Sequence, residues 1–304
     1  MTKQDNTAGE LSKLIEKVRN TGAYCHFNKA VMQSAKLLEN SLSSFITNID
    51  EDLTSNDLLN QTKEIIVMSE NPLHTFHVLH KIRKYDDATF IHSLNVAILC
   101  NLYGQWTNMP QEECDVLTLA GLLHDVGKMK IPEEIIKKPG SLTEEEFNEV
   151  KNHPRRGYLL LEPLHIDDRI KKAALQHHER CDGSGYPDGL VSEQIDDFAK
   201  IVAIADIYDA LTSARVYRGP LCPFAVIDMI EKDNQQKKFD SRFLIPFLTG
   251  IVRSFIGCEV LLSDGRKAKI LKENTDQFAK PIVQIGQEQI DLQNEKECVI
   301  QSLI

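Results

Sequence analysis

The sequence predicts a mainly α-helical protein: a helical bundle with a helical N-terminal region and a small β appendage at the C-terminus. Apolar residues recur at helical spacing within the first 85 residues. Several stretches between about residues 89 and 255 are apolar almost all round, which is typical of buried helices. After Gly257 the apolar runs become short and are separated by turn residues, which indicates strands.

Size and charge exclude some classes of function. The chain has 304 residues, 42% of them apolar, which is enough to bury a sizeable core. The formal net charge of −10 disfavours binding of long nucleic acids, because an acidic protein repels the phosphate backbone. A small anionic ligand held by a few local Lys and Arg residues is still compatible with this charge.

The cysteines and the N-terminus indicate the compartment. The seven cysteines are scattered and form no C-x-x-C pair. The first residues lack the apolar stretch of a signal peptide, and no run of about 18 apolar residues occurs. We therefore predict a cytoplasmic protein with mostly free thiols and no membrane span.

Residues 1–85 are predicted to form a helical N-terminal region. Apolar residues have helical spacing from Leu11 to Val18, and a second amphipathic pattern runs from Val31 to about Ile49. Ser55 or Asn56 is suited to cap a further helix. The region lacks the βαβ alternation of a receiver domain. Its candidate roles are sensing a signal, formation of a homodimer, or packing as a plain helical extension on the central domain, which is the most common of the three.

Residues 86–256 are predicted to form the central domain. The stretches FIHSLNVAILCNLYGQW, CDVLTLAGLLHDVGK and FAKIVAIADIYDALTSA are apolar almost throughout and predict buried helices. Thr143, followed by three glutamates, marks a helix start. We expect this helix to run through His153, with a kink at Pro154, and to continue to Leu161. PFAVIDMIEKD and SRFLIPFLTGIVRSF predict the last two helices.

Residues 257–304 are predicted to form a small antiparallel β subdomain. Two apolar runs flank Ser263-Asp264-Gly265, which is a hairpin signal. Further short runs near Pro281–Val283, Ile290–Leu292 and Val299–Ile300 predict additional strands. None of these segments carries a catalytic motif.

Imidazole and carboxylate groups lie on or beside the apolar stretches of the central domain. Each of them alone could be a hydrogen-bonded core residue, but burying so many without partners is costly, and together they favour a metal site. Neutral imidazoles and carboxylate oxygens suit Fe, Mn or Zn, and the lack of cysteine in the cluster argues against a purely structural zinc site. The candidate ligands are His92, His124, Asp125, His153, His177, His178 and Asp206.

The motifs that carry these residues occur in a characteristic order. They read HDVGKMKIPEEIIKKPGSLTEEEF, then NHP, then HHERCDGSGYP, then ADIYDALTSARVYR. This series resembles the HD-GYP family of the HD phosphohydrolase superfamily over about residues 89–220. The resemblance implies an HD-type helical bundle that holds two or three metal ions, usually iron or manganese. It also implies hydrolysis of cyclic di-GMP to linear pGpG or to GMP.

The resemblance also implies how the ligands are shared. One metal ion would be held by His92, His124, Asp125 and Asp206, and Asp125 would bridge to a second one held by His153, His177 and His178. Members with a third metal site carry Glu four residues before the first histidine, where this chain has Ala88. We therefore predict two divalent cations, Fe or Mn. Two metals about 4 Å apart lower the pKa of a shared water, and the bridging hydroxide so formed attacks the phosphodiester.

Four further residues are implied to act on the substrate. Lys128 matches a family lysine that contacts phosphate, and it is with Asp125 a catalytic candidate. Arg215 and Arg218 match basic residues that clamp the substrate phosphates, a task suited to the planar guanidinium. Tyr186, in the Gly-Tyr-Pro loop, is expected to stack on a guanine or to donate to a phosphate. Without the family match, each basic residue is more often a solvated surface charge.

Two acids are candidates for supporting roles. Asp182 is expected to orient a metal ligand or to cap the Gly-Tyr-Pro loop. Asp209 follows Asp206 by three residues on one predicted helix, and it is either a second supporting acid or a helix-surface acid.

Three functions stay compatible with the sequence. The first is a cyclic di-GMP phosphodiesterase. The second is a phosphohydrolase for another cyclic dinucleotide, such as cyclic GMP-AMP, or for a nucleotide, because the motifs determine the chemistry better than the bases. The third is a catalytically silent signalling scaffold, which the complete ligand set argues against. In the family, the Gly-Tyr-Pro loop is also proposed as a contact surface for diguanylate cyclase domains, which makes such a domain a candidate partner.

Overall fold

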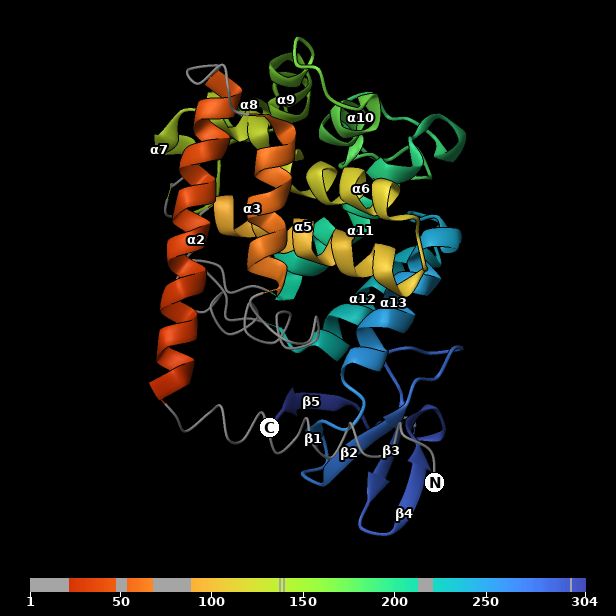
Figure 1. Cartoon of the computed structure of the whole chain (residues 1–304). Coiled ribbons are helices and arrows are strands. Elements are labelled where there is room, and N and C mark those ends of the chain that lie inside the picture. Colours follow the sequence, from red (N-terminus) through yellow and green to blue (C-terminus); the bar gives the residue numbers. More distant parts are fainter. Residues whose placement is uncertain are drawn as a thin grey trace.

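The computed structural model is a bundle of helices with an antiparallel sheet at its C-terminal end (Figure 1). The predicted mainly α fold class with a β appendage is confirmed. Among the residues that the structure describes, no helix is both long and apolar enough to cross a membrane. The described residues are 22–47, 54–67, 89–136, 138, 140–212, 221–295 and 297–304.

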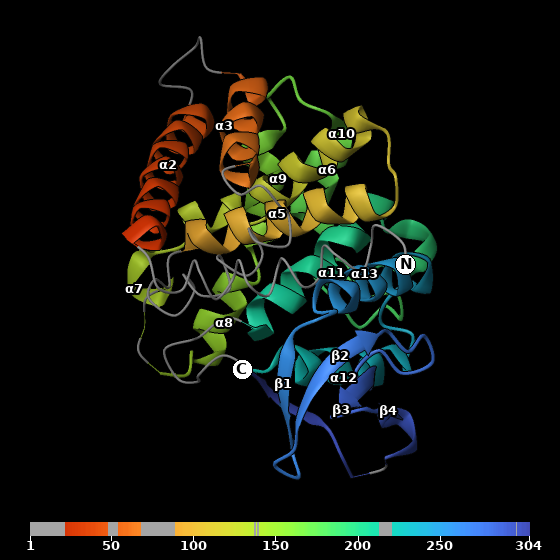
Figure 2. The same cartoon turned by 60° about the horizontal axis from the view of Figure 1, so that its bottom comes forward.

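Two N-terminal helices lie side by side at one edge of the bundle (Figures 1 and 2). α2 spans Gly22–Thr47 and α3 spans Ser55–Val67. Both helices contact α5 (Thr89–Trp106), and α3 also packs against α6 (Gln111–Leu123). The helix predicted around Leu11–Val18 lies outside the described residues.

The residue that caps α3 differs from the predicted one. Thr54 takes this position instead of Ser55 or Asn56: its hydroxyl accepts from the Asp57 amide at 3.3 Å, and the Asp57 carboxylate accepts from the Thr54 amide at 2.8 Å. The pair satisfies two amides that have no partner inside the helix. Ser55 is already the first helical residue, so its side chain is one position too late for this role.

Three helices form the centre of the bundle. α5 packs along α6, and α11 (Asp197–Thr212) packs against both. Most described side chains of these helices are buried, as their apolar sequences predict. Because a helix buried on all sides has no solvent face, its polar side chains have to meet one another or a bound ion inside the protein.

Shorter helices surround one end of this centre. They are η1 (Val126–Lys130), α7 (Glu133–Ile136), α8 (Glu144–Val150), α9 (His153–Leu161) and α10 (Asp168–Gln176). Of these, η1 packs against α9, and α10 packs against α9, α6 and α11.

The predicted helix start at Thr143 is confirmed by a capping box. The Thr143 hydroxyl accepts from the Glu146 amide at 3.2 Å, and the Glu146 carboxylate accepts from the Thr143 amide at 2.7 Å. The prediction that this helix runs through His153 is wrong. α8 ends at Val150, and α9 starts afresh at His153 with Pro154 in its first turn, where a missing N–H costs nothing.

The last part of the bundle follows the prediction. After η2 (Ser192–Gln194), α12 spans Pro223–Asn234 and α13 spans Ser241–Ser254. Glu231 of α12 accepts the amides of Phe278 and Ala279 at 2.7 and 3.1 Å. This carboxylate therefore ties the C-terminal segment to the bundle.

The C-terminal segment forms a five-stranded sheet of order β4-β3-β2-β1-β5 in which all neighbours are antiparallel. The hairpin predicted at Ser263-Asp264-Gly265 joins β1 to β2, and the predicted antiparallel arrangement is confirmed. The strands are β1 (Glu259–Leu262), β2 (Lys267–Lys272), β3 (Ile282–Ile285), β4 (Glu288–Asp291) and β5 (Ile300–Leu303), with η3 (Leu292–Asn294) after β4.

Candidate metal centre

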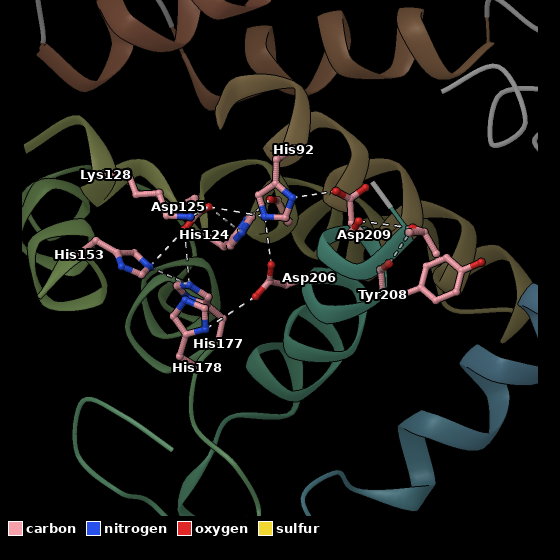
Figure 3. A network of polar contacts seen from close by, with 12 residues as sticks. His92, His124, Asp125, Lys128, His153, His177, His178, Asp206, Tyr208 and Asp209 are labelled. Carbon is pink, nitrogen blue, oxygen red and sulfur yellow. Dashed lines mark hydrogen bonds and ion pairs between the residues drawn. The ribbon is translucent and has the colours of Figure 1, made fainter. Parts of the chain in front are cut away.

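All seven predicted metal ligands lie together inside the bundle (Figure 3). Two groups of these side chains have ligand atoms within 4.8 Å of one another and could each hold a metal ion. One group is His92, His124 and Asp125, and the other is Asp125, His153, His177 and His178.

Asp125 stands between the two groups of histidines. Its Oδ2 lies 3.6 Å from Nε2 of His92 and 3.5 Å from Nε2 of His124. Its Oδ1 lies 3.2 Å from Nε2 of His153 and 3.7 Å from Nε2 of His177. Each carboxylate oxygen thus faces a different group, which is the arrangement that a bridging ligand needs.

Asp206 also faces both groups. Its Oδ1 lies 3.0 Å from Nε2 of His92, and its Oδ2 lies 3.7 Å from Nδ1 of His178. The resemblance assigned Asp206 to one metal alone. In the structure its second oxygen points toward the neighbouring group as well.

The backbone determines which ring nitrogens face the centre. In His124, His153 and His177, Nδ1 lies 2.7–3.1 Å from a carbonyl oxygen three or four residues earlier. Because a carbonyl can only accept, these Nδ1 atoms carry the proton, and each Nε2 presents a lone pair to the centre. Metal-binding histidines are commonly oriented in this way.

Several atoms that face the centre are poorly satisfied by the described residues. Nε2 of His153 and Nε2 of His177 are 3.2 Å apart, and two lone pairs at this distance repel each other. Within the described part of the chain, Nε2 of His124 and Oδ1 of Asp125 are buried without a hydrogen-bond partner. Buried polar atoms of this kind are costly unless a cation satisfies them. The donor set therefore fits divalent metal ions.

Burial and charge set the protonation states. Burial lowers the pKa of His124 to about 3, so the ring is neutral at physiological pH. Burial opposes ionisation of Asp125, but the nearby positive charge of Lys128 is the main effect that holds the pKa of this carboxyl well below its usual range. Neutral imidazole and ionised carboxylate are the forms that bind metals.

Asp209 contacts the ring nitrogen of His92 that faces away from the centre. Its carboxylate lies 2.8 Å from Nδ1 of His92, and it is buried, so it is not a helix-surface acid. Burial lowers the pKa of His92, but hydrogen bonds to Asp206 and Asp209 outweigh it and raise the pKa to about 10. Binding of a metal ion through Nε2 therefore has to release a proton from this ring.

Close backbone packing brings η1 to the centre. A Cβ on Gly127 would overlap the carbonyl oxygen of His153, so only glycine lets these two segments approach so closely. This contact holds Asp125 and Lys128 beside His153. Lys128 donates to Oδ2 of Asp125 and is partly exposed.

The Gly-Tyr-Pro loop closes one side of the centre. Tyr186 stacks on His178, with ring centroids 4.6 Å apart and an angle of 30° between the planes. Asp182 caps the loop: its carboxylate accepts from the amide and the hydroxyl of Ser184 at 3.0 and 2.6 Å. Of the two roles considered for Asp182, the described contacts are those of a loop cap.

Glu179 holds the same loop and was missed by the sequence analysis. Its side chain is buried and accepts the amides of Asp188 and Leu190 at 2.7 and 2.9 Å. Gly185 packs against it so closely that a Cβ there would overlap the Glu179 backbone. The sequence contained a signal for this role: Glu179 directly follows two predicted ligands and precedes a loop whose backbone amides need hydrogen-bond acceptors.

Two substrate-binding candidates, Arg215 and Arg218, lie outside the described residues, in the segment 213–220. Ala88 also lies outside the described residues.

Comparison with known proteins agrees with this architecture. The HD domain family model matches residues 59–243. A cyclic di-GMP phosphodiesterase of Pseudomonas aeruginosa is 33% identical over 233 residues, which cover 76% of this chain and 55% of that protein. A 3′3′-cGAMP-specific phosphodiesterase of Vibrio cholerae is 39% identical over 154 residues, which cover 51% of this chain and 36% of that protein. The chain spans about half the length of the first relative and about a third of the second.

A solved structure has the same fold. The HDG"Y"P protein from Bdellovibrio bacteriovorus superposes with a TM-score of 0.60 at 20% sequence identity, covering 81% of this chain and 80% of that chain. The family model spans more than half of the chain, and the motifs from His92 to Asp206 stand in the order typical of HD-GYP proteins. The chain therefore belongs to the HD domain family, in its HD-GYP branch.

Proposed function

We propose that the protein is a metal-dependent phosphodiesterase that hydrolyses a cyclic dinucleotide. The observation that carries this proposal is the arrangement around Asp125, whose two carboxylate oxygens face different groups of histidines. A structural metal site is closed by its protein ligands. Two adjacent sites that share a carboxylate suit catalysis on a phosphodiester.

The ligand assignment is part of the proposal. His92, His124, Asp125 and Asp206 would hold one metal ion, and His153, His177 and His178 would hold the second together with Asp125. When bound, two divalent cations there would supply Lewis acidity and a nucleophile at neutral pH. The proposed metals are Fe or Mn.

The protein's own side chains would orient the substrate. Lys128, partly exposed beside Asp125, can exchange this partner for a substrate phosphate. Tyr186 covers the ring of His178 and presents an aromatic edge at the rim of the centre. We propose Arg215 and Arg218 as further phosphate contacts, on the motif alone.

Cyclic di-GMP is the first candidate substrate, with linear pGpG or GMP as product. The similarity to the Pseudomonas phosphodiesterase, which extends over three quarters of the chain, supports this choice. A second candidate is 3′3′-cGAMP, because the Vibrio relative specific for it is also similar.

The test is metal analysis of anaerobically purified protein, with turnover of both dinucleotides measured on the same sample. We expect about two Fe or Mn per chain and linear product. Asp125→Asn should lower the metal content and reduce turnover by a factor on the order of 1,000 or more. Removal of a central catalytic group typically has an effect of this size. Asp168→Asn, on the exposed first turn of α10, is the matched control.

Other outcomes separate the alternatives. Asp125→Asn protein that turns over as fast as wild type would refute the site assignment. Two metals without turnover of either dinucleotide would point to another phosphate substrate. No metal and no turnover after reconstitution would favour the signalling scaffold.

A further inference from the structure

A cavity of about 230 Å³ lies between the N-terminal helix α2 and the metal centre. Glu39 and Ser43 of α2 contribute to its wall, and so do Asp125 and Lys128 of the centre. α2 runs beside α3 and contacts α5, which carries His92 (Figures 1 and 2). A ligand bound by the metal centre can therefore extend into this cavity and meet residues of the N-terminal region.

Apart from Ser93 of α5, the rest of the wall is apolar. The apolar side chains come from α2, α5, the end of α6 and η1. A flat heterocycle gains most from such a wall, because it buries both faces while its edge needs polar partners. Pockets for drug-sized ligands measure about 300–1,000 Å³, so this cavity suits one ring system of a larger substrate. The apolar residues are Leu42, Phe90, Leu122, Val126 and Met129.

The charges in the wall distinguish the two ends of a nucleotide. Lys128 attracts a phosphate at the end beside Asp125, whereas the carboxylate of Glu39 repels one. An ionised carboxylate only accepts hydrogen bonds. The Watson–Crick edge of guanine offers it two adjacent N–H donors, whereas that of adenine offers one donor beside one acceptor. The cavity thus suits a guanine more than an adenine.

We propose that this cavity takes one base of the cyclic dinucleotide and that Glu39 selects guanine there. This inference rests on the proposed phosphodiesterase function. It places a specificity-determining residue outside the HD domain match, which begins at residue 59. The N-terminal region then has a direct role in choosing the substrate.

The present partner of Glu39 does not prevent this role. Its carboxylate lies 2.5 Å from Nζ of Lys36, and the two side chains are 39% and 68% exposed. An exposed ion pair of this kind is weak and exchanges easily for another partner. Glu39 can therefore turn to a base that enters the cavity.

The test uses the full chain with Mn²⁺ and compares kcat/KM for cyclic di-GMP and cyclic di-AMP. In Glu39→Gln the amide offers one donor and one acceptor, which match adenine. We expect the ratio of guanine to adenine substrate to fall about 10- to 100-fold, the discrimination expected of one bidentate base contact. Glu39→Ala should lose preference for guanine without gaining activity on adenine. Glu64→Gln, an exposed position on α3, is the matched control and should leave the ratio unchanged.

The possible outcomes distinguish a failure of this inference from a failure of the proposed phosphodiesterase function. If wild type hydrolyses cyclic di-GMP and the ratio is the same in folded Glu39→Gln, the proposed role of Glu39 is wrong and the phosphodiesterase stands. If wild type hydrolyses neither of these substrates nor 3′3′-cGAMP, the phosphodiesterase proposal fails and the inference falls with it. Circular dichroism checks folding, and Glu39→Ala provides a second variant should Glu39→Gln not fold.

Discussion

The buried carboxylate of Glu179 provides a sharp test of how the Gly-Tyr-Pro loop is held. It accepts two amides, from Asp188 at 2.7 Å and from Leu190 at 2.9 Å. A hydrogen bond to a charged acceptor contributes about 1.5–3 kcal/mol to stability. Glu179→Gln keeps one oxygen but turns an N–H group toward the second amide. We therefore expect a loss of about 1.5–3 kcal/mol, the value of one such bond.

Urea denaturation measures this loss. With a dependence of about 1–3 kcal/mol per molar urea, the midpoint should fall by about 1 M. The matched control is Glu193→Gln, the same change at an exposed position of η2, and its midpoint should equal that of wild type. If Glu179→Gln unfolds at the same urea concentration as this control, the two hydrogen bonds do not hold the loop.

A kinetic measurement separates positioning from stability. Because Tyr186 stacks on His178 only while the loop is in place, KM for the dinucleotide should rise more than kcat falls. If Glu179 only stabilised the fold, KM would be unchanged under conditions in which the variant is folded. The assay is run well below the unfolding midpoint, so that both proteins are folded.

Two further predictions concern the groups that support the metal ligands. Asp209→Asn removes the negative charge that contacts Nδ1 of His92, and we expect the affinity for metal to fall about 10- to 100-fold in a Mn²⁺ titration. Unchanged affinity would mean that Asp209 contributes to packing alone. Gly127→Ala places a Cβ against the carbonyl oxygen of His153, and we expect the free energy of unfolding to fall by about 1–3 kcal/mol, measured by thermal unfolding. A melting temperature equal to that of wild type would show that η1 can move away without cost.

Local patterns in the sequence were sufficient for most of the helices and for the choice of candidate ligands. The stretches that form α5, α6 and α11 are apolar on nearly all sides of the helix, and burial of such helices follows from their composition alone. The cap at Thr143 and the hairpin at Ser263-Asp264-Gly265 depend on neighbours within a few residues, so short-range rules predicted both. The histidines and aspartates were recognisable because such groups are rarely buried without a partner.

The partners of these groups were decided by tertiary packing. Three features depend on contacts between segments far apart in the chain: which oxygen of Asp125 faces which histidine, the burial of Asp209, and the cavity that Glu39 lines together with Asp125. The break before His153 places this residue at the start of α9, where Nε2 of its ring lies 3.2 Å from Oδ1 of Asp125. Periodicity reports which face of a helix is buried, but not which side chain of another helix it meets there.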